Sequence, residues 1–223
     1  MIEIPQVEPF GDSAFLIQFD QANLEDANSD AIRLHTWLNG HRINGILESI
    51  PGFASLLITY DAFILGADEV EGWIKNLALS CPDQKHDLGR LVEVPVIYGG
   101  SAGPDLLSVA NLHNLTPEEV IQLHCQGEYR VAMMGFTPGF VYLSGLDPKL
   151  TTPRLPTPRT SVPAGSVGIA GTQTGIYSID SPGGWQLIGR TKIKLFEPSL
   201  ESPFYFRLGD RIKFIATEST LSI

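Results

Sequence analysis

The segment from Met134 to Thr191 most constrains what this chain can fold into, because glycine, proline and aromatic residues crowd there at irregular spacing. Between Gly135 and Gly189 it holds 10 of the 22 glycines and 7 of the 16 prolines. Glycine permits a positive φ and proline holds φ at about −65°, so their alternation prescribes turns. Disorder is the alternative, but branched apolar residues recur at strand-like intervals. We therefore expect a rigid, turn-rich β structure that presents a surface.

The composition is that of a soluble globular protein, with 43% hydrophobic and 18% charged residues. The most apolar region, residues 53–65, is interrupted by polar residues from Thr59 on and predicts no transmembrane helix. The N-terminus has neither the basic nor the apolar region of a secretory signal. Two cysteines, Cys81 and Cys125, suit a reducing compartment better than a disulfide scaffold. We expect a cytoplasmic protein that does not enter a membrane.

The net charge of −10 is unevenly distributed. Residues 1–90 hold 5 basic and 14 acidic residues, whereas seven basic residues stand against two acidic ones between Arg130 and Lys194. This local positive excess can attract a carboxylate or phosphate, although scattered solvated cations are the commoner explanation. No basic stripe with interleaved aromatics occurs, so nucleic acid is not an expected partner.

The first part of the chain alternates predicted strands and helices. In order, these are a strand at 13–19, a helix at 23–39, strands at 43–50 and 54–60, a helix at 67–80 and a strand at 91–97. This βαββαβ order is compatible with a ferredoxin-like α/β sandwich. The polar, turn-rich stretch 81–90 predicts a domain boundary, which divides the chain into domains at 1–88 and 89–223.

The second domain is predicted to be mainly β structure. Thr116, Pro117 and Glu119 form the signature of a helix start with a capping box. Beyond Arg130 only short strand candidates follow, ending with a strand at 210–216. A compact β-barrel with one or two helices is the natural closure, so the expected class is α+β.

Self-sufficient catalytic signatures are absent from the sequence. Gly165, Gly168 and Gly171 are spaced GxxGxxG rather than GxGxxG, and no Walker A motif occurs. The five histidines show no HxH or HxxxH spacing, so no metal site is expected. His124, on the capped helix, is a weak catalytic candidate, although a packed, hydrogen-bonded histidine is the commoner case.

Three polar residues have a possible binding role. Asp105, after Gly103-Pro104, could reach into a site, but capping a helix at Leu106 is its expected use. Arg154 and Arg159 lie beside prolines, so a stiffened backbone would present their side chains to an anionic ligand. Surface ion pairs explain these two arginines equally well.

Five aromatic residues lie beside the glycines and prolines, where exposed rings would form a platform for a ligand or a partner protein. They are Phe136, Phe140, Tyr142, Tyr177 and Trp185. Packing in the barrel core is an equal alternative for the two phenylalanines and a less expected one for Trp185.

Six sequence motifs occur in a recognisable order over most of residues 94–214. They are VPVIYGGSAGPDL from Val94, GFTPGFVYLSGL from Gly135, TPRLPTPRTSVPAGSVGIAGTQTGIY from Thr152, SPGGWQLIGRT from Ser181, LFEP from Leu195 and GDRIKF from Gly209. In these motifs the chain resembles the carboxyltransferase subdomain C/D-like family, which includes the B subunit of 5-oxoprolinase, the kinase inhibitor KipI and allophanate hydrolase subunit 1. The N-terminal part resembles the family more loosely.

The resemblance implies a small α/β domain followed by a cyclophilin-like barrel. It also implies a cytoplasmic hydrolase subunit that is inactive alone and works with two partners: a homologous second protein similar to the C subunit of 5-oxoprolinase, and a barrel protein similar to its A subunit. Such a complex uses ATP as a co-substrate to open 5-oxo-L-proline (pyroglutamate) to L-glutamate, with no bound metal or organic cofactor. Two alternatives stay open: a KipI-like module that inhibits a sensor histidine kinase, and a subunit related to allophanate hydrolase or urea carboxylase.

The Gly135–Thr191 surface would then contact the homologous second protein and form part of a site for ATP and a small anionic substrate. Arg154, Arg159 or Arg190 would hold a carboxylate or phosphate of the ligand. Backbone N–H groups of the glycine loops would donate further hydrogen bonds. The predicted surface residues are Phe136, Pro138, Phe140, Tyr142, Arg154, Arg159, Gly171, Gln173, Tyr177, Trp185, Arg190 and Thr191.

Overall fold

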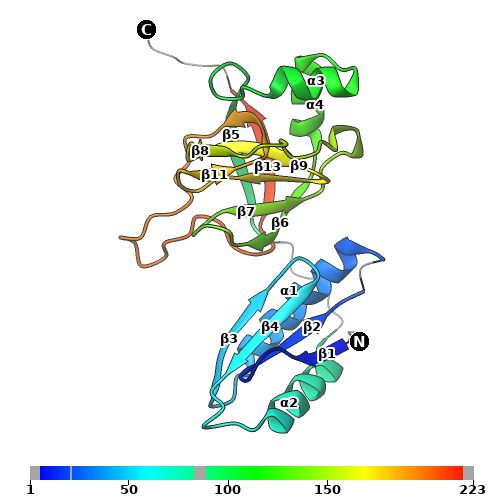
Figure 1. The fold of residues 1–223 in the computed structure, drawn as a ribbon, viewed down its shortest axis with the longest axis vertical. Helices are drawn as coiled ribbons and strands as arrows, with labels where there is room; N and C mark the ends of the chain where they lie inside the picture. Colours follow the sequence, from blue (N-terminus) through cyan, green and yellow to red (C-terminus); the bar gives the residue numbers. More distant parts are fainter. Residues whose placement is uncertain (1–5, 21, 83–88, 218–223) are drawn as a thin grey trace. The chain divides into compact units, whose positions relative to one another are not determined.

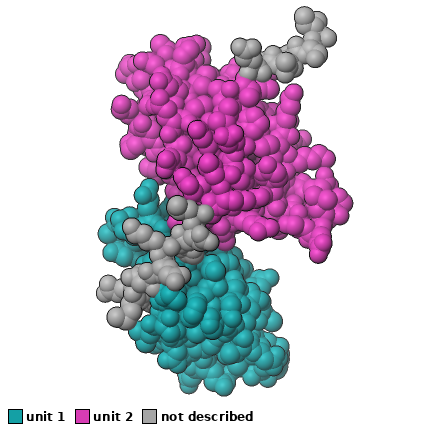
Figure 2. Space-filling model, turned by 180° about the vertical axis from the view of Figure 1, so that it is seen from behind, with its two compact units in different colours: residues 1–87 teal, residues 88–223 magenta. Residues whose placement is uncertain are grey.

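The computed structural model describes residues 6–20, 22–82 and 89–217. The chain divides into two compact units, Met1–Asp87 and Leu88–Ile223, coloured teal and magenta in Figure 2. No helix in the described ranges is long and apolar enough to cross a membrane.

The first unit is a four-stranded antiparallel sheet packed against two helices (Figure 1). Its strands, in the spatial order β1-β2-β4-β3, are β1 (Gln6–Pro9), β2 (Ala14–Gln18), β3 (Ile46–Pro51) and β4 (Ser55–Tyr60). Its helices are α1 (Leu24–Gly40) and α2 (Ala67–Ser80). The two helices and alternate residues of the central strands form one hydrophobic core.

Local sequence signals explain both helices. Asn23 caps α1 through its side-chain oxygen, which accepts hydrogen bonds from the backbone N–H groups of Glu25 and Asp26. The apolar stripe of α1 is buried, as its spacing predicts. In α2 the stripe begins with Val70 and Ile74, both fully buried. Both predicted helices are therefore confirmed to within one residue.

The prediction that residues 91–97 complete a βαββαβ order in the N-terminal domain is wrong. That segment is strand β5 (Leu91–Tyr98), and it pairs with β12 and β13 of the second unit. In the first unit β1 pairs with β2 instead, so the order there is ββαββα. The ferredoxin-like class is therefore not confirmed. An apolar strand has no local feature that selects its sheet, because pairing is decided by partners distant in sequence.

The second unit contains a closed seven-stranded barrel among the residues described, with the strand order β10-β7-β6-β13-β5-β12-β9. Strand β5 runs parallel to β13, and the other neighbours are antiparallel. Besides β5, its strands are β6 (Tyr129–Met134), β7 (Val141–Ser144), β9 (Ser166–Ala170), β10 (Gln173–Ile176), β12 (Gln186–Arg190) and β13 (Arg211–Ala216). The predicted barrel is thus observed.

The remaining elements of the second unit cover the barrel. They are the two-stranded sheet of β8 (Arg159–Val162) and β11 (Ser181–Gly183), helices α3 (Leu106–His113) and α4 (Pro117–Gln126), and the short 3₁₀ helix η1 (Pro148–Leu150). Helices α3 and α4 lie together at one end of the barrel (Figure 1). The predicted capping box is present, since Thr116 and Glu119 exchange backbone and side-chain hydrogen bonds.

Candidate site in a glycine-lined pocket

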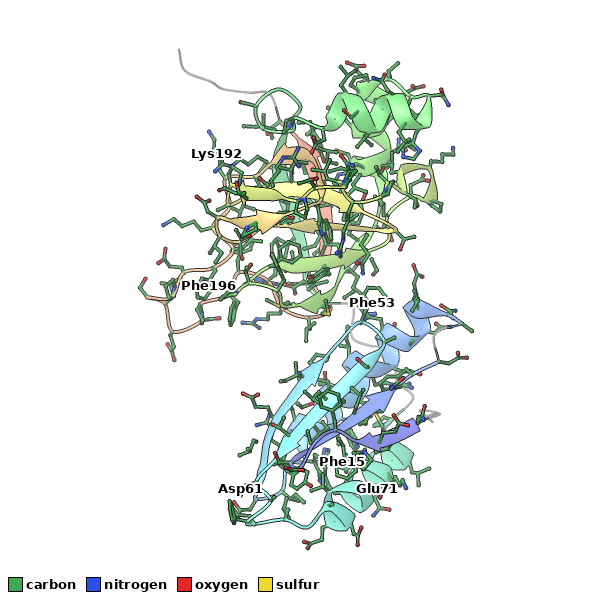
Figure 3. The ribbon with its side chains drawn as sticks, in the orientation of Figure 1. Phe15, Phe53, Asp61, Glu71, Lys192 and Phe196 are labelled. Atoms are coloured by element: carbon green, nitrogen blue, oxygen red, sulfur yellow. The ribbon has the colours of Figure 1, made fainter. Side chains whose placement is uncertain are left out.

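A pocket of about 970 Å³ lies in the barrel unit. Its lining comes from five parts of the chain: the loop after β5, the turn before β9, the segment after β10, the end of β12 and the stretch that follows β12. Its lining includes Gly99–Ala102, Ala164–Gly165, Ser178–Asp180, Arg190–Lys194 and Phe196–Glu197. Figure 3 labels two lining residues, Lys192 and Phe196, which lie on the same side of the barrel unit. The pocket is within the size range of small-molecule sites.

The loop after β5 offers unused backbone donors to this pocket. Gly99 and Gly100 both have positive φ, 71° and 52°. In that conformation the N–H groups of Gly100 and Ser101 donate no hydrogen bond within the described chain. Gly103 allows the loop to lie against β12, because a Cβ there would stand 2.0 Å from the carbonyl oxygen of Ile188. The loop is therefore a fixed backbone surface with two free donors.

Three cationic side chains line the same pocket, and they differ in how far they are already paired. Arg190 donates through Nε to the carbonyl of Ala164 at 2.8 Å, which leaves its terminal N–H groups available. Lys194 pairs with Glu197 at 3.0 Å, and this pair lowers the pKa of the Glu197 carboxyl. Lys192 is exposed and forms no ion pair with a described residue.

The loop from Phe136 to Phe140 is connected to one wall of the pocket. The hydroxyl of Ser178, a lining residue, donates to the carbonyl of Pro138 at 2.6 Å. Gly139, at φ 80°, lies so close to Phe196 that a Cβ would be 3.0 Å from the phenylalanine Cβ. Phe136 also has a positive φ, 69°, which is costly for a bulky side chain and is commonest at functional positions.

The five predicted aromatics form one contiguous cluster. Phe140 is at its centre, with ring centroids 5.6 Å from Phe136, 4.6 Å from Tyr142, 5.0 Å from Tyr177 and 5.5 Å from Trp185. The cluster packs on the outside of the barrel, because Val141 and Val167 point into the barrel core and their neighbours in the strands point outward.

The prediction of an exposed aromatic platform is wrong for most of this cluster. Phe140, Tyr177 and Trp185 are buried, Tyr142 is half-buried, and only Phe136 is well exposed. Gly168 and Gly175 pair directly across β9 and β10. Their missing side chains make room for the rings: a Cβ at Gly175 would lie 3.0 Å from the Trp185 ring and 3.2 Å from that of Phe140.

Asp105 and Arg159 bind each other. Both carboxylate oxygens of Asp105 accept hydrogen bonds from Arg159 Nη2, at 2.6 and 2.8 Å. The carboxylate also accepts the N–H of Leu187 at 2.6 Å, and Arg159 donates to the carbonyl of Trp185. The predicted capping role of the Asp105 side chain is therefore wrong: it occupies the N-cap position of α3 without capping the helix, because these other donors use its oxygens.

Arg154 remains available for an anion. Within the described chain its side chain is exposed and forms no hydrogen bond or ion pair. Burial raises the pKa values of Tyr142 and Tyr177, and the positive charge of Arg154 opposes that rise at both hydroxyls. Arg154 thus lies beside the aromatic cluster, whereas Arg190 faces the pocket.

His124 is fully buried inside the barrel. Thr174 donates its hydroxyl to the carbonyl of Gly168, so its oxygen accepts from His124 Nε2–H at 3.0 Å. His124 Nδ1 then accepts from the hydroxyl of Tyr98 at 2.7 Å. Burial lowers the pKa of His124 to about 3, so the ring is neutral near pH 7. His124 therefore has the geometry of a packed, hydrogen-bonded histidine, which the sequence left open as the alternative to a catalytic one.

The family model described as "Carboxyltransferase domain, subdomain C and D" matches residues 5–206 of this chain. The chain belongs to this family.

Proteins of known name are similar to this chain. The 5-oxoprolinase B subunit of Bacillus subtilis is 42% identical over 220 residues, which cover 94% of this chain and 92% of the relative. That of Haemophilus influenzae is 58% identical over 172 residues, or 76% of this chain and 79% of the relative. A urea amidolyase of Lachancea kluyveri is 30% identical over 92% of this chain but only 13% of its own length.

Two solved structures at 38% and 40% identity have a similar fold. The crystal structure of TTHA0988 aligns with a TM-score of 0.81 and 38% identity, over 92% of this chain and 40% of that one. This chain therefore spans less than half of that longer protein. The conserved uncharacterized protein PH0987 of Pyrococcus horikoshii aligns with a TM-score of 0.58 and 40% identity, over 96% of this chain and 98% of that one.

In this family member the predicted surface residues fall into separate places. Arg190 and Thr191 line the pocket, and the aromatic cluster with Arg154 and Arg159 lies outside the barrel. Gly171 is in the turn between β9 and β10, where its N–H donates to the carbonyl of Thr152, and Gln173 is the first residue of β10. The binding role of each of these residues stays a prediction.

Sequence reasoning missed the pocket as a unit. Lys192 and Lys194 contribute to the positive excess but are not among the predicted site residues, and Gly100 and Ser101 read only as part of a glycine-rich loop. The alternating cations at 190, 192 and 194 are the available signal. These cations indicate a binding site only together with the loop after β5, which lines the same pocket.

Proposed function

We propose that this chain is a subunit of an ATP-dependent 5-oxoprolinase complex that converts 5-oxo-L-proline to L-glutamate. The supporting observation is its 42% identity to a protein named as the B subunit of 5-oxoprolinase over nearly the full length of both chains. Two more relatives with that name, at 58% and 43% identity, support the same proposal.

The chemistry explains why such a reaction would need ATP. The amide of an unstrained five-membered lactam is a poor electrophile, since nitrogen donates electron density to the carbonyl. Phosphorylation of the carbonyl oxygen would supply a leaving group. The site must then hold an anionic substrate and a nucleotide together and orient the two reacting groups.

This chain would provide binding surface rather than a complete catalytic set. Its most prominent histidine, His124, is buried and neutral, and Asp105 is occupied by Arg159. The pocket offers Arg190, Lys192 and the free N–H groups of the glycine loop. We therefore expect the isolated chain to be inactive. Two partners, similar to the C and A subunits of 5-oxoprolinase and called the C-type and A-type partners below, would supply the remaining groups in the cytoplasm, where ATP is available.

The loop containing Phe136 would contribute to the contact with the C-type partner. Phe136 is 61% exposed and adopts a strained backbone conformation, and Pro138 beside it is also exposed. An exposed aromatic on a rigid loop is a common hot spot of protein interfaces. The free Arg154 side chain lies beside the same aromatic cluster, where it could meet an acidic group of the partner.

Co-expression tests the proposal directly. The chain is purified with and without A-type and C-type partners from the same source, and glutamate release from 5-oxo-L-proline is measured with ATP and with a non-hydrolysable analogue. We expect glutamate only from the complete set and only with ATP. An intact complex that releases no glutamate and hydrolyses no ATP in the presence of 5-oxo-L-proline would refute the proposal.

The urea amidolyase relative gives a second candidate. It is 30% identical over 92% of this chain, which supports a carboxyltransferase-like role toward a urea-derived substrate. The same preparation, supplied with a biotinylated partner, urea, bicarbonate and ATP, separates the two candidates. Carboxylated urea with no glutamate from 5-oxo-L-proline would favour the second.

A further inference from the structure

We propose that the pocket beside the Gly99–Ala102 loop binds a nucleoside triphosphate, so that this chain itself holds the ATP of the complex. The inference rests on the proposed function for the choice of nucleotide. The binding chemistry is argued from the pocket alone.

The size of the pocket fits a nucleotide better than a small cyclic acid. Its volume of about 970 Å³ corresponds to roughly thirty water molecules at ~30 Å³ each. A five-membered lactam acid would fill only a small part of that space. Sites for drug-sized and cofactor-sized ligands bury most of the ligand surface, so a good fit needs a larger molecule.

The polar part of the lining suits a chain of phosphates. Lys192 has no ion-pair partner in the described chain, and Arg190 keeps its terminal N–H groups free. The N–H groups of Gly100 and Ser101 add two neutral donors that need no rearrangement. Asp180, a competing carboxylate in the lining, already accepts the N–H of Ala164 at 2.7 Å. Several separate donors match a multiply charged ligand, whereas one carboxylate would leave most of them unused.

The apolar part of the lining suits a nucleobase. Four half-buried apolar side chains face the pocket, namely Ile97, Ile179, Ile193 and Phe196. Phe196 stacks on Phe204 with ring centroids 5.4 Å apart, which helps to hold its ring in place. Figure 3 shows Lys192 and Phe196 well separated on the same side of the unit. A ligand that meets both must be elongated, with a charged end and a flat apolar end.

Calorimetry on the purified chain provides the test. The probes are ATP, inorganic tripolyphosphate and 5-oxo-L-proline. We expect ATP and tripolyphosphate to bind and ATP to bind more tightly. Lys192→Ala and Arg190→Ala should each weaken the binding of ATP and of tripolyphosphate by about tenfold or more, because each removes a charge-assisted donor. Lys149→Ala removes another exposed lysine of the same unit, outside the pocket, and should leave the affinities for ATP and tripolyphosphate unchanged.

A second variant separates the two ends of the site. Phe196→Leu keeps an apolar side chain beside Gly139 but removes the ring, so ATP affinity should fall while tripolyphosphate affinity stays the same. Failure of the wild-type chain to bind ATP or tripolyphosphate overturns the proposal. So does equal weakening by Lys149→Ala, or binding of 5-oxo-L-proline alone with dependence on Lys192.

The outcome is independent of the glutamate assay. A chain that binds ATP through Lys192 in a complex that forms no glutamate would retain the nucleotide site and reject the proposed reaction. A complex that forms glutamate with unchanged Michaelis constant for ATP after Lys192→Ala would retain the reaction and reject this site.

Discussion

Nη2 of Arg159 donates to both carboxylate oxygens of Asp105, at 2.6 and 2.8 Å, and this ion pair joins the start of α3 to strand β8. The pair is largely removed from solvent, with side-chain exposures of 12% and 28%. Its carboxylate also holds the N–H of Leu187, and the guanidinium holds the carbonyl of Trp185. Three segments of the barrel unit, namely the start of α3, strand β8 and the stretch Trp185–Leu187 at the beginning of β12, therefore meet at one ion pair.

Removing one partner of this pair should destabilise the barrel unit. Asp105→Ala leaves Arg159 charged and half-buried and the N–H of Leu187 without an acceptor. We expect a loss of about 2–4 kcal/mol in the free energy of unfolding. Urea titration followed by Trp185 fluorescence, with Trp37 and Trp73 replaced by phenylalanine, measures it. Lys194→Ala breaks the exposed Lys194–Glu197 pair and should have little effect on stability; equal losses would contradict the assigned role.

The paired glycines under the aromatic cluster should resist substitution. A Cβ at Gly175 would lie 2.7 Å from the carbonyl oxygen of Val141, which backbone pairing holds in place. Gly175→Ala should therefore cost about 1–3 kcal/mol in thermal or urea unfolding. At Gly184 the nearest atom would be 3.6 Å away, so Gly184→Ala should be close to neutral. If Gly175→Ala left the free energy of unfolding unchanged, the close contact with Val141 would not prevent a methyl group at this position.

The strained Phe136 should matter for assembly and not for folding. Phe136→Gly relieves a positive φ of 69°, which costs a bulky residue about 1 kcal/mol, and the lost side chain is 61% exposed. The isolated chain should keep or slightly increase its stability. Its affinity for the C-type partner, measured by calorimetry or sedimentation, should fall at least about tenfold. Unchanged affinity would remove Phe136 from the proposed contact.

His124 should make stability pH-dependent. Burial lowers its pKa from 6.5 to about 3 in the folded chain, so the unfolded state binds more protons between those values. Stability is therefore fully present above about pH 6.5 and falls as the pH drops toward 3. Between pH 7 and pH 5 this group alone should remove about 2 kcal/mol from the free energy of unfolding. Its neighbours Tyr98 and Tyr129 have raised pKa values and stay neutral throughout.

Substitution of His124 provides the control for that pH dependence. His124→Gln keeps a side chain able to donate to Thr174 and to accept from Tyr98, but it does not titrate. The variant should be less stable at pH 7 and should lose less stability on acidification. An identical pH slope in wild type and variant would assign the acid sensitivity to other groups.

Local signals in the sequence determined the helices and most strands of this protein. The cap at Asn23, the capping box at Thr116 and the apolar stripes act within a few residues, so they could be read directly. The short edge strand β1 was missed because Gln6–Pro9 has only one apolar residue. The sequence also indicated the correct set of aromatic residues, since all five lie within the Gly135–Gly189 segment.

Only the tertiary structure decided how these pieces combine. It assigned β5 to the barrel, buried Trp185 over Gly168 and Gly175, and paired Asp105 with Arg159 across 54 positions. It also placed the loop at Gly100 beside Lys192, which lies about ninety residues further along the chain. Helix and strand patterns are local, whereas a barrel brings distant strands together, and its pocket is formed where they meet.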